Sequence, residues 1–350
     1  MKEIYIGNRL ISENSPALIV AELSANHHNN LKIALETIKA IKESGADAVK
    51  VQTYRPDSIT LDSDNELFQA RKDSHWAGKK LFDLYQEGSL PYEWHEELKS
   101  YSESMGLIFF STPFDIQDVD FLYNLDVPAY KIASLEINDI PLISYVAEKG
   151  KPIILSTGIA TPEDIELAVK TCLNKGNDKI IILKCTSSYP TPPEEAHLLS
   201  IQWLKKKFDT LTGLSDHTLD TYAPIAAISL GAKFIEKHFV LDKNLKSLDA
   251  DFSLEPNEFT AMVKAIRETE KLLGNYEYSV TQKMELARKS RRSIFIIKDI
   301  KQSEEFTIKN TKVIRPGAGL HPKYFHDILG KRAARNLKMG TPLTFEDIID

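Results

Sequence analysis

Short apolar runs alternate with longer amphipathic segments through most of the 350-residue chain. The segments between the runs carry apolar residues at the three- and four-residue spacing typical of helices. Runs that are apolar throughout are typical of strands buried on both faces, as in parallel sheets. The eight runs lie at residues 17–22, 48–52, 107–111, 129–134, 152–156, 179–185, 210–215 and 233–239.

Eight strand–helix units within about 250 residues predict a (β/α)8 TIM barrel of the α/β class. An open doubly wound sheet is the alternative. The barrel is favoured because the units number eight and no glycine-rich turn follows the first strand. Ahead of the barrel, apolar residues alternate on either side of Gly7–Asn8, which predicts an N-terminal hairpin.

The pattern changes after Gly274. We expect a barrel domain over residues 1–275, a polar linker over 276–289 and a small domain of short strands and turns over 290–350. A domain of about 60 residues is marginal on its own, so we expect it to lean on another surface.

Composition excludes several classes of protein. Apolar residues make up 42% of the chain and charged residues 27%, as in ordinary globular proteins. The net charge is −6, and the densest basic cluster, "RKSRRS" at 288–293, favours a solvated linker over a nucleic-acid site. Two cysteines make no disulfide framework. Without an apolar leader or a membrane-length apolar stretch, the chain is expected to be cytoplasmic and to have no membrane contact.

Barrel enzymes place their chemistry at the carboxyl ends of the strands. Polar residues gather at these predicted ends: Glu22, Lys50, Gln52, Ser111, Thr112, Lys131, Ser134, Glu136, Ser156, Thr157, Lys184, Thr186, Tyr189, Ser215, Glu236 and His238.

Lys50 and Lys131 each stand inside an apolar run. A lysine in a barrel interior must meet an anion or lose its proton. Two inward lysines with a ring of hydroxyls indicate a site for a phosphate or a carboxylate. The alternative is that each lysine is half-exposed with a salt-bridge partner.

His217 and His238 stand at the ends of the last two runs, which are neighbours in a barrel, and Glu22 ends the first run. Two imidazoles with a carboxylate or waters suit Mn²⁺, Fe²⁺ or Zn²⁺. Open positions on such a metal would allow it to polarise a substrate carbonyl. The alternative is a pair of packed histidines without a chemical role.

Several stretches resemble the sialic-acid synthase family over nearly the whole chain: "AELSANHHNNL", "VKVQTYRPDSIT", "FFSTPFD", "AYKIASLEIND", "ILSTGIAT", "LKCTSSYPTP", "GLSDHTLD" and "EKHFVLDK". The stretches "VIRPGAGLHP" and "GKRAARNLKMGTPLT" resemble the C-terminal antifreeze-like (SAF) domain of that family. The resemblance implies condensation of phosphoenolpyruvate with an N-acylated amino sugar to a nine-carbon 2-keto acid. It also implies a divalent metal, with Mn²⁺ expected and Mg²⁺ or Co²⁺ as alternatives.

Other stretches resemble one branch of the family: "QTYRPDSIT", "WAGKKLFDLYQEG", "PYEWH" and "SLDADFSLEPNEF". Sialic and legionaminic acid synthases typically have Pro-Gly-Pro-Asp where this chain has "KSLDAD", and Asn where it has Ser187. Both departures favour a 2,4-diacetamido-2,4,6-trideoxy hexose as the acceptor. Synthesis of N-acetylneuraminate or legionaminate is the alternative within the family.

The resemblance assigns roles by motif. Glu22 is the expected catalytic carboxylate, and His217 and His238 are the expected metal ligands. Phosphoenolpyruvate would be held by Lys50, Thr112, Lys131, Ser134, Ser156 and Ser215, and the sugar by Gln52, Glu136, Tyr189, Asp249 and Arg315. In the family the loop that carries Arg315 comes from the partner subunit, which implies a domain-swapped homodimer.

Three rival functions remain. A synthase of seven- or eight-carbon sugar acids would need a second basic cluster for a sugar phosphate, and only Lys184 and Lys237 suggest one. A non-catalytic carbohydrate- or ice-binding protein would not need strand ends rich in Lys, Ser and His. "PGAGLHP" lacks the G-x-G-x-x-G pattern of a nucleotide-binding loop.

Overall fold

The computed structural model describes residues 2–70, 77–274 and 277–350. The chain divides into two compact units, Met1–Gly274 and Asn275–Asp350. The expected domain boundary at 275 and the first residue of the expected linker lie outside the described residues, as does Trp76, the first residue of "WAGKK".

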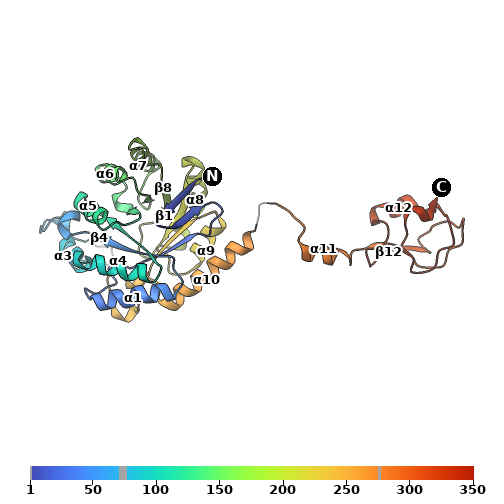
Figure 1. Cartoon of the computed structure of the whole chain (residues 1–350), viewed down its shortest axis with the longest axis horizontal. Helices are drawn as coiled ribbons and strands as arrows, with labels where there is room; N and C mark the ends of the chain where they lie inside the picture. The colour runs from blue at the N-terminus through green and yellow to red at the C-terminus, as the bar shows by residue number, and fades with distance from the viewer. Residues whose placement is uncertain (1, 71–76, 275–276) are drawn as a thin grey trace. The chain divides into compact units, whose positions relative to one another are not determined.

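The first unit is a closed barrel of eight parallel strands, so the predicted barrel is confirmed (Figure 1). The strands follow one another around the barrel in chain order, and the last pairs with the first. They are β3 (Leu18–Glu22), β4 (Ala48–Thr53), β5 (Ile108–Pro113), β6 (Tyr130–Ile132), β7 (Ile153–Ser156), β8 (Ile180–Cys185), β9 (Leu211–Asp216) and β10 (Phe234–His238).

Helices follow the strands and surround them (Figure 1). Local sequence sets their ends: Asn30 caps the first of them through its side chain, and Thr161 precedes a proline at the first turn of another. The helices are α1 (Leu31–Glu43), α4 (His95–Ser104), α5 (Ile116–Asn124), α6 (Ile140–Glu148), α7 (Pro162–Asn174), α8 (Ser200–Phe208), α9 (Tyr222–Ser229) and α10 (Pro256–Leu273).

The connection from β4 to α4 holds additional short helices that the periodicity did not predict. These are α2 (Pro56–Ile59), a 3₁₀ turn at Glu66–Phe68 and α3 (Leu81–Gly88). With three to eight residues each, they are too short for a clear helical period.

The predicted hairpin is present as β1 (Glu3–Ile6) and β2 (Arg9–Ser12). Its buried Ile4, Ile6 and Ile11 join the cluster that fills the barrel interior, which includes Leu18 and Phe234 at the amino ends of their strands. The hairpin therefore closes the amino end of the barrel, and the carboxyl ends of the strands are left to form the site.

The second unit has its own small core. Two antiparallel pairs, β11 (Ser293–Ile296) with β12 (Thr311–Ile314) and β13 (Arg332–Ala333) with β14 (Ile348–Ile349), carry short irregular connections. Helix α11 (Gln282–Arg288) lies within the segment expected as a linker, and α12 spans Phe325–Ile328. The core side chains are Ile294, Ile296, Ile300, Phe306, Ile328, Ala333, Leu337 and Leu343. None of the described helices in either unit is long and apolar enough to cross a membrane.

Candidate active site

The strand register brings polar residues together at the carboxyl ends of four strands. Lys50 pairs with Glu22 across β4 and β3, and His238 pairs with Glu22 across β10 and β3. Glu236 pairs with Ser215 across β10 and β9. Side chains two residues apart on a strand share a face, so Glu236 and His238 point to the same side. Glu22 and His238 are neighbours because the last strand of the barrel, β10, pairs with the first, β3.

Two lysines and two carboxylates form a buried ion cluster there. Lys50 Nζ lies 2.6 Å from Glu22 Oε2 and 3.7 Å from Glu236 Oε1. Lys131 Nζ lies 3.6 Å from the same Glu236 oxygen, which also accepts a hydrogen bond of 3.2 Å from Ser215. Both lysines are fully buried in the mouth of the barrel, so the half-exposed alternative is wrong.

The cluster separates the pKa values of its two carboxylates. Burial, partly offset by Lys50, raises the pKa of Glu22 to about 7. Burial also acts on Glu236, but Lys131 and Lys50 outweigh it and lower the pKa of that carboxyl. Glu236 is therefore held ionised, and Glu22 titrates near neutral pH. Carboxylates whose pKa values are pushed apart in this way are typical of acid–base sites.

The predicted hydroxyl groups lie beside this cluster. Lys50 Nζ donates to Thr112 Oγ1 at 3.2 Å, and Ser134 Oγ accepts from the Gly158 amide at 3.0 Å. A Cβ on Gly158 would stand 2.7 Å from Ser134 Oγ, so only glycine fits against that hydroxyl. Ser156 Oγ is buried without a hydrogen-bond partner among the described residues. A buried hydroxyl without a partner is suited to an incoming anion.

The two histidines face each other with ring centroids 5.4 Å apart. His217 Nδ1 donates to the Thr186 carbonyl at 3.0 Å, so Nε2 is the nitrogen that the neutral ring would offer to a metal. Burial lowers the pKa of His217, but Cys185 and the Thr186 carbonyl outweigh it and raise that pKa above its usual value. His238 Nδ1 is buried without a hydrogen-bond partner, 3.7 Å from Asp249 Oδ2. Burial and then His217 lower the pKa of His238 well below its usual value. The ring is therefore neutral, as metal ligation requires.

These residues fit a divalent metal with two imidazole ligands. Among the residues that the structure describes, no three His, Cys, Asp or Glu side chains converge as a complete ligand set. Other coordination positions would therefore be left to water or to substrate oxygens.

From the sequence, Lys237 was considered only as part of a second basic cluster for a sugar phosphate, but the structure buries it completely. Its ammonium pairs with Asp216 and donates to the Thr218 carbonyl at 2.5 Å. Asp216 and Thr218 flank His217 in the chain, and Lys237 precedes His238. The Lys237–Asp216 pair therefore fixes the backbone next to both histidines. Because the ammonium group is already paired, it offers no site for a sugar phosphate.

The predicted sugar contacts divide into two groups. Gln52 Nε2 donates to Glu22 Oε1 at 3.2 Å and to Ser24 Oγ at 3.0 Å, and Ser24 in turn donates to Asp249. The Tyr189 ring lies 4.3 Å from that of His217. These residues meet at the histidine side of the mouth.

The other two predicted sugar contacts lie elsewhere. Glu136 is partly exposed, but its Oε2 is enclosed without a hydrogen-bond partner among the described residues. Burial of the carboxyl raises its pKa to about 7, and Lys131 is the strongest charge that opposes this rise. Glu136 therefore lies on the Lys131 side of the mouth. Arg315 is exposed on the second unit, so the fold of one chain does not assign it a partner.

Glu236 is the main site residue that the role assignments missed. It contacts both lysines, yet it was noted only as a strand-end residue. Its spacing of two residues before His238 was the available signal, because that spacing places both side chains on the inner face.

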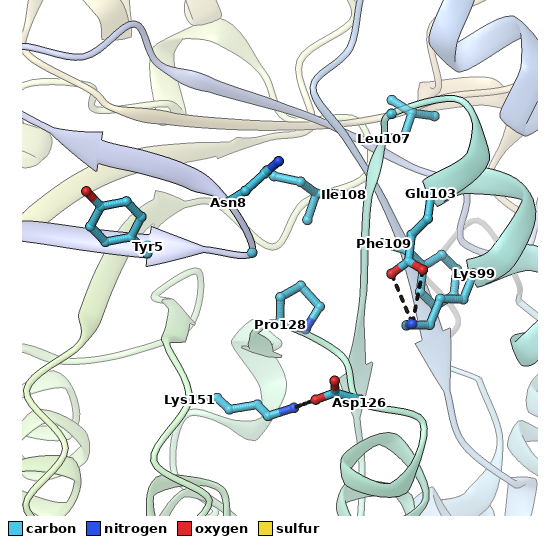
Figure 2. A pocket seen from close by; sticks show the side chains of 12 residues that line it. Tyr5, Asn8, Lys99, Glu103, Leu107, Ile108, Phe109, Asp126, Pro128 and Lys151 are labelled. Atoms are coloured by element: carbon cyan, nitrogen blue, oxygen red, sulfur yellow. Dashed lines mark hydrogen bonds and ion pairs between the residues drawn. The ribbon is translucent and has the colours of Figure 1, made fainter.

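A separate cleft of about 710 Å³ lies at the opposite end of the barrel (Figure 2). It runs between the hairpin tip at Asn8, the start of β5 at Ile108 and the turn at Pro128. Ion pairs line it, such as Lys151–Asp126 at 2.6 Å. It contains none of the predicted site residues.

Comparisons with known proteins identify the family of the chain. The NeuB family model matches residues 37–278, and the SAF domain model matches residues 291–349. The pseudaminic acid synthase of Campylobacter jejuni is 45% identical over 97% of this chain and 98% of its own length. That of Helicobacter pylori is 46% identical over 95% of this chain and 98% of its own length.

A solved structure is similar as well. The crystal structure of N-acetylneuraminic acid synthetase from Leptospira borgpetersenii, in complex with citrate, has a TM-score of 0.73 and 32% identity. The match covers 82% of this chain and 95% of that one.

Proposed function

The chain belongs to the NeuB family, and from this premise we propose that it catalyses the reaction of pseudaminic acid synthases. The chain is an enzyme, a transferase that condenses phosphoenolpyruvate with a sugar. The acceptor is 2,4-diacetamido-2,4,6-trideoxy-L-altrose, and the products are a nine-carbon 2-keto acid and phosphate. Identities of 44–46% to pseudaminic acid synthases, against 34–35% to legionaminic acid synthases, support this acceptor.

The observation that carries the proposal is the buried cluster of Lys50, Lys131, Glu22 and Glu236 beside the facing rings of His217 and His238. Before substrate binds, the carboxylates neutralise the lysines. Phosphoenolpyruvate then offers its phosphate and carboxylate to the two ammonium groups, with Thr112, Ser134, Ser156 and Ser215 as hydroxyl partners.

His217 and His238 are the residues that would hold the divalent cation, with Mn²⁺ expected. When bound, the cation polarises the aldehyde carbonyl of the open-chain acceptor. The histidines hold this group close to Glu22, because His238 and Glu22 are paired across β10 and β3.

The reaction then needs one proton acceptor. Carbon 3 of the enol attacks the aldehyde carbon, and positive charge develops at carbon 2. Water adds at carbon 2 to give a tetrahedral intermediate. One proton of the water passes through Glu22 to the alkoxide at the former aldehyde carbon. The other proton goes to the phosphate, which leaves as its C–O bond breaks and the ketone forms. Glu22, which titrates near pH 7, takes the proton from that water, while Lys50 and Lys131 stabilise the departing phosphate.

The acceptor is held from two sides. Gln52, Asp249 and Tyr189 contact it on the histidine side, and Glu136 on the Lys131 side. Arg315 of a second subunit binds one of its N-acyl groups, which makes the active form a domain-swapped homodimer. The exposed position of Arg315 on a small separate unit supports this arrangement.

The test is phosphate release from phosphoenolpyruvate with Mn²⁺, with 2,4-diacetamido-2,4,6-trideoxy-L-altrose or N-acetylmannosamine, each with and without a chelator. Release that requires the first sugar and stops with the chelator is expected. Release only with N-acetylmannosamine would keep the family and overturn the acceptor. Release that ignores the chelator would remove the metal role of His217 and His238.

A further inference from the structure

Tyr54 continues the inward-facing row of strand β4. Lys50, Gln52 and Tyr54 are spaced two residues apart, and the intervening Thr53 faces the opposite way. The Thr53 hydroxyl lies 2.8 Å from His95 Nε2, on the helix side of the strand. Tyr54 therefore stands above Gln52, one layer further out toward the mouth of the barrel.

The ring of Tyr54 is enclosed, with only 5% of the residue exposed. It makes edge contacts with Phe114, at a centroid distance of 5.1 Å, and with Tyr85, at 6.0 Å. Its hydroxyl oxygen is not among the enclosed polar atoms that lack a partner in the described part of the chain, so it is open to water or to a ligand. A tyrosine with an enclosed ring and an accessible hydroxyl can offer that hydroxyl to a bound molecule.

The surrounding chain leaves room for this hydroxyl. A Cβ on Gly88, the last residue of α3, would stand 2.9 Å from Tyr54 Oη and 3.3 Å from Leu248 Cδ1. Real Cβ atoms do not approach that closely, so a side chain at position 88 would displace the phenol. The glycine therefore keeps a niche in which the hydroxyl is held.

The niche lies beside predicted sugar contacts. Burial, and after it the charge of Asp249, raises the pKa of Tyr54. Burial and the charge of Glu136 do the same for the pKa of Tyr85. A Cβ on Gly88 would also stand 3.4 Å from Ala25, the neighbour of Ser24. Ser24 hydrogen-bonds both Gln52 and Asp249. The niche of the Tyr54 hydroxyl therefore adjoins two of the predicted sugar contacts.

We propose that Tyr54 determines acceptor specificity by donating a hydrogen bond from its hydroxyl to the carbonyl oxygen of the acceptor's 4-acetamido group. This inference rests on the proposed function. Tyr54 follows the end of β4, beyond Lys50 and Gln52, so it meets a part of the sugar away from the reacting aldehyde carbon. Of the two acetamido groups, the one on carbon 4 is the further from that carbon. The hydroxyl satisfies the carbonyl oxygen, and the ring edges of Tyr85 and Phe114 receive the methyl group. N-acetylmannosamine lacks this group.

Tyr54→Phe removes the hydroxyl and keeps the ring. Tyr130→Phe is the matched control, because Tyr130 is also buried but its hydroxyl faces the Val119 carbonyl at 3.5 Å, away from the mouth. We would measure steady-state kinetics with phosphoenolpyruvate and the diacetamido sugar. We would also measure the equilibrium binding of that sugar and of N-acetylmannosamine to the metal-free enzyme, and the thermal unfolding of each variant.

In Tyr54→Phe, affinity for the diacetamido sugar should fall about tenfold, with the KM for phosphoenolpyruvate and the binding of N-acetylmannosamine unchanged. Tyr130→Phe should bind both sugars as the wild type does. Unchanged binding in Tyr54→Phe, or an equal loss for both sugars, would overturn the assignment. A wild-type enzyme that binds both sugars equally well would overturn it too. If the proposed function itself is wrong, the wild type will release no phosphate with the diacetamido sugar, which distinguishes this outcome from a wrong assignment of Tyr54.

Discussion

Glu22 Oε2 lies 2.6 Å from Lys50 Nζ, and the two residues are direct partners across β3 and β4. Glu22, the proposed base, and Lys50, the proposed phosphoenolpyruvate ligand, therefore form an ion pair with each other in the free enzyme. If phosphoenolpyruvate binds Lys50 as proposed, Glu22 would lose this partner and its pKa would rise further, because Lys50 is the strongest influence that lowers it. Substrate binding would then make Glu22 a stronger proton acceptor.

Glu22→Gln should reduce kcat about a thousandfold, because the amide cannot take a proton from water. It should leave the affinity for Mn²⁺ intact, since the ligand pair is unchanged. Steady-state kinetics and calorimetric titration of the metal measure the two effects. Glu103→Gln, at the amino end of the barrel, is the control. Unchanged turnover in Glu22→Gln would contradict the role.

Lys50→Ala should raise the KM for phosphoenolpyruvate by about ten- to a hundredfold, since a charge-assisted contact to the anion is lost. The KM for the sugar should change little. Lys151→Ala removes a lysine from the cleft at the other end of the barrel and should alter neither value. An effect on the sugar KM alone would show that the two substrate positions are inverted.

Mixing two inactive variants tests the domain-swapped dimer. A heterodimer of Glu22→Gln and Arg315→Ala subunits contains one barrel with an intact Glu22 and an intact Arg315 from the other subunit. Random exchange makes about half of the dimers mixed, so about a quarter of the wild-type activity should return. Absence of recovery, with subunit exchange verified by mass spectrometry, would mean that Arg315 does not act across subunits.

Stability should fall in mild acid because of buried histidines. Burial lowers the pKa of His95 to about 4, against 6.5 for an ordinary histidine. The unfolded chain therefore binds a proton first as the pH falls. This group's share of stability, about 3 kcal/mol, is complete above pH 6.5 and is lost as the pH falls toward 4.

Urea unfolding at several pH values measures this share. His95→Gln should flatten the dependence between pH 4 and 6.5, with the remainder due to His27, whose pKa burial also lowers to about 4. His321→Gln, at an exposed histidine of the second unit, should leave the dependence unchanged. An unchanged slope in His95→Gln would contradict the prediction.

The barrel could be predicted from sequence because its strands are buried on both faces and therefore read as unbroken apolar runs. Lys50 and Lys131 could be predicted to point into the barrel for the same reason, because each is a charged residue within such an apolar run. The short helices α2 and α3 carry too little periodicity to be recognised, and with α3 the setting of Tyr54 was missed.

Contacts within the site depend on register, which periodicity does not supply. The Glu236 carboxylate contacts Lys50 on β4 and Lys131 on β6, and this double contact depends on the strand register. Lys237 was considered for a sugar-phosphate cluster because its actual partner, Asp216, belongs to the neighbouring strand and could not be paired with it from the sequence. Arg315 lies on a separate unit, so neither the sequence pattern nor a single chain places it.

The pairing of β10 with β3 joins the end of the barrel sequence to its beginning. A nascent or partly refolded chain that lacks this seam has its first seven strands but holds His238 away from Glu22. Such a chain would show most of the native circular dichroism and no turnover. Recovery of activity after dilution from denaturant is therefore a direct reporter of ring closure, the last topological event in forming the barrel.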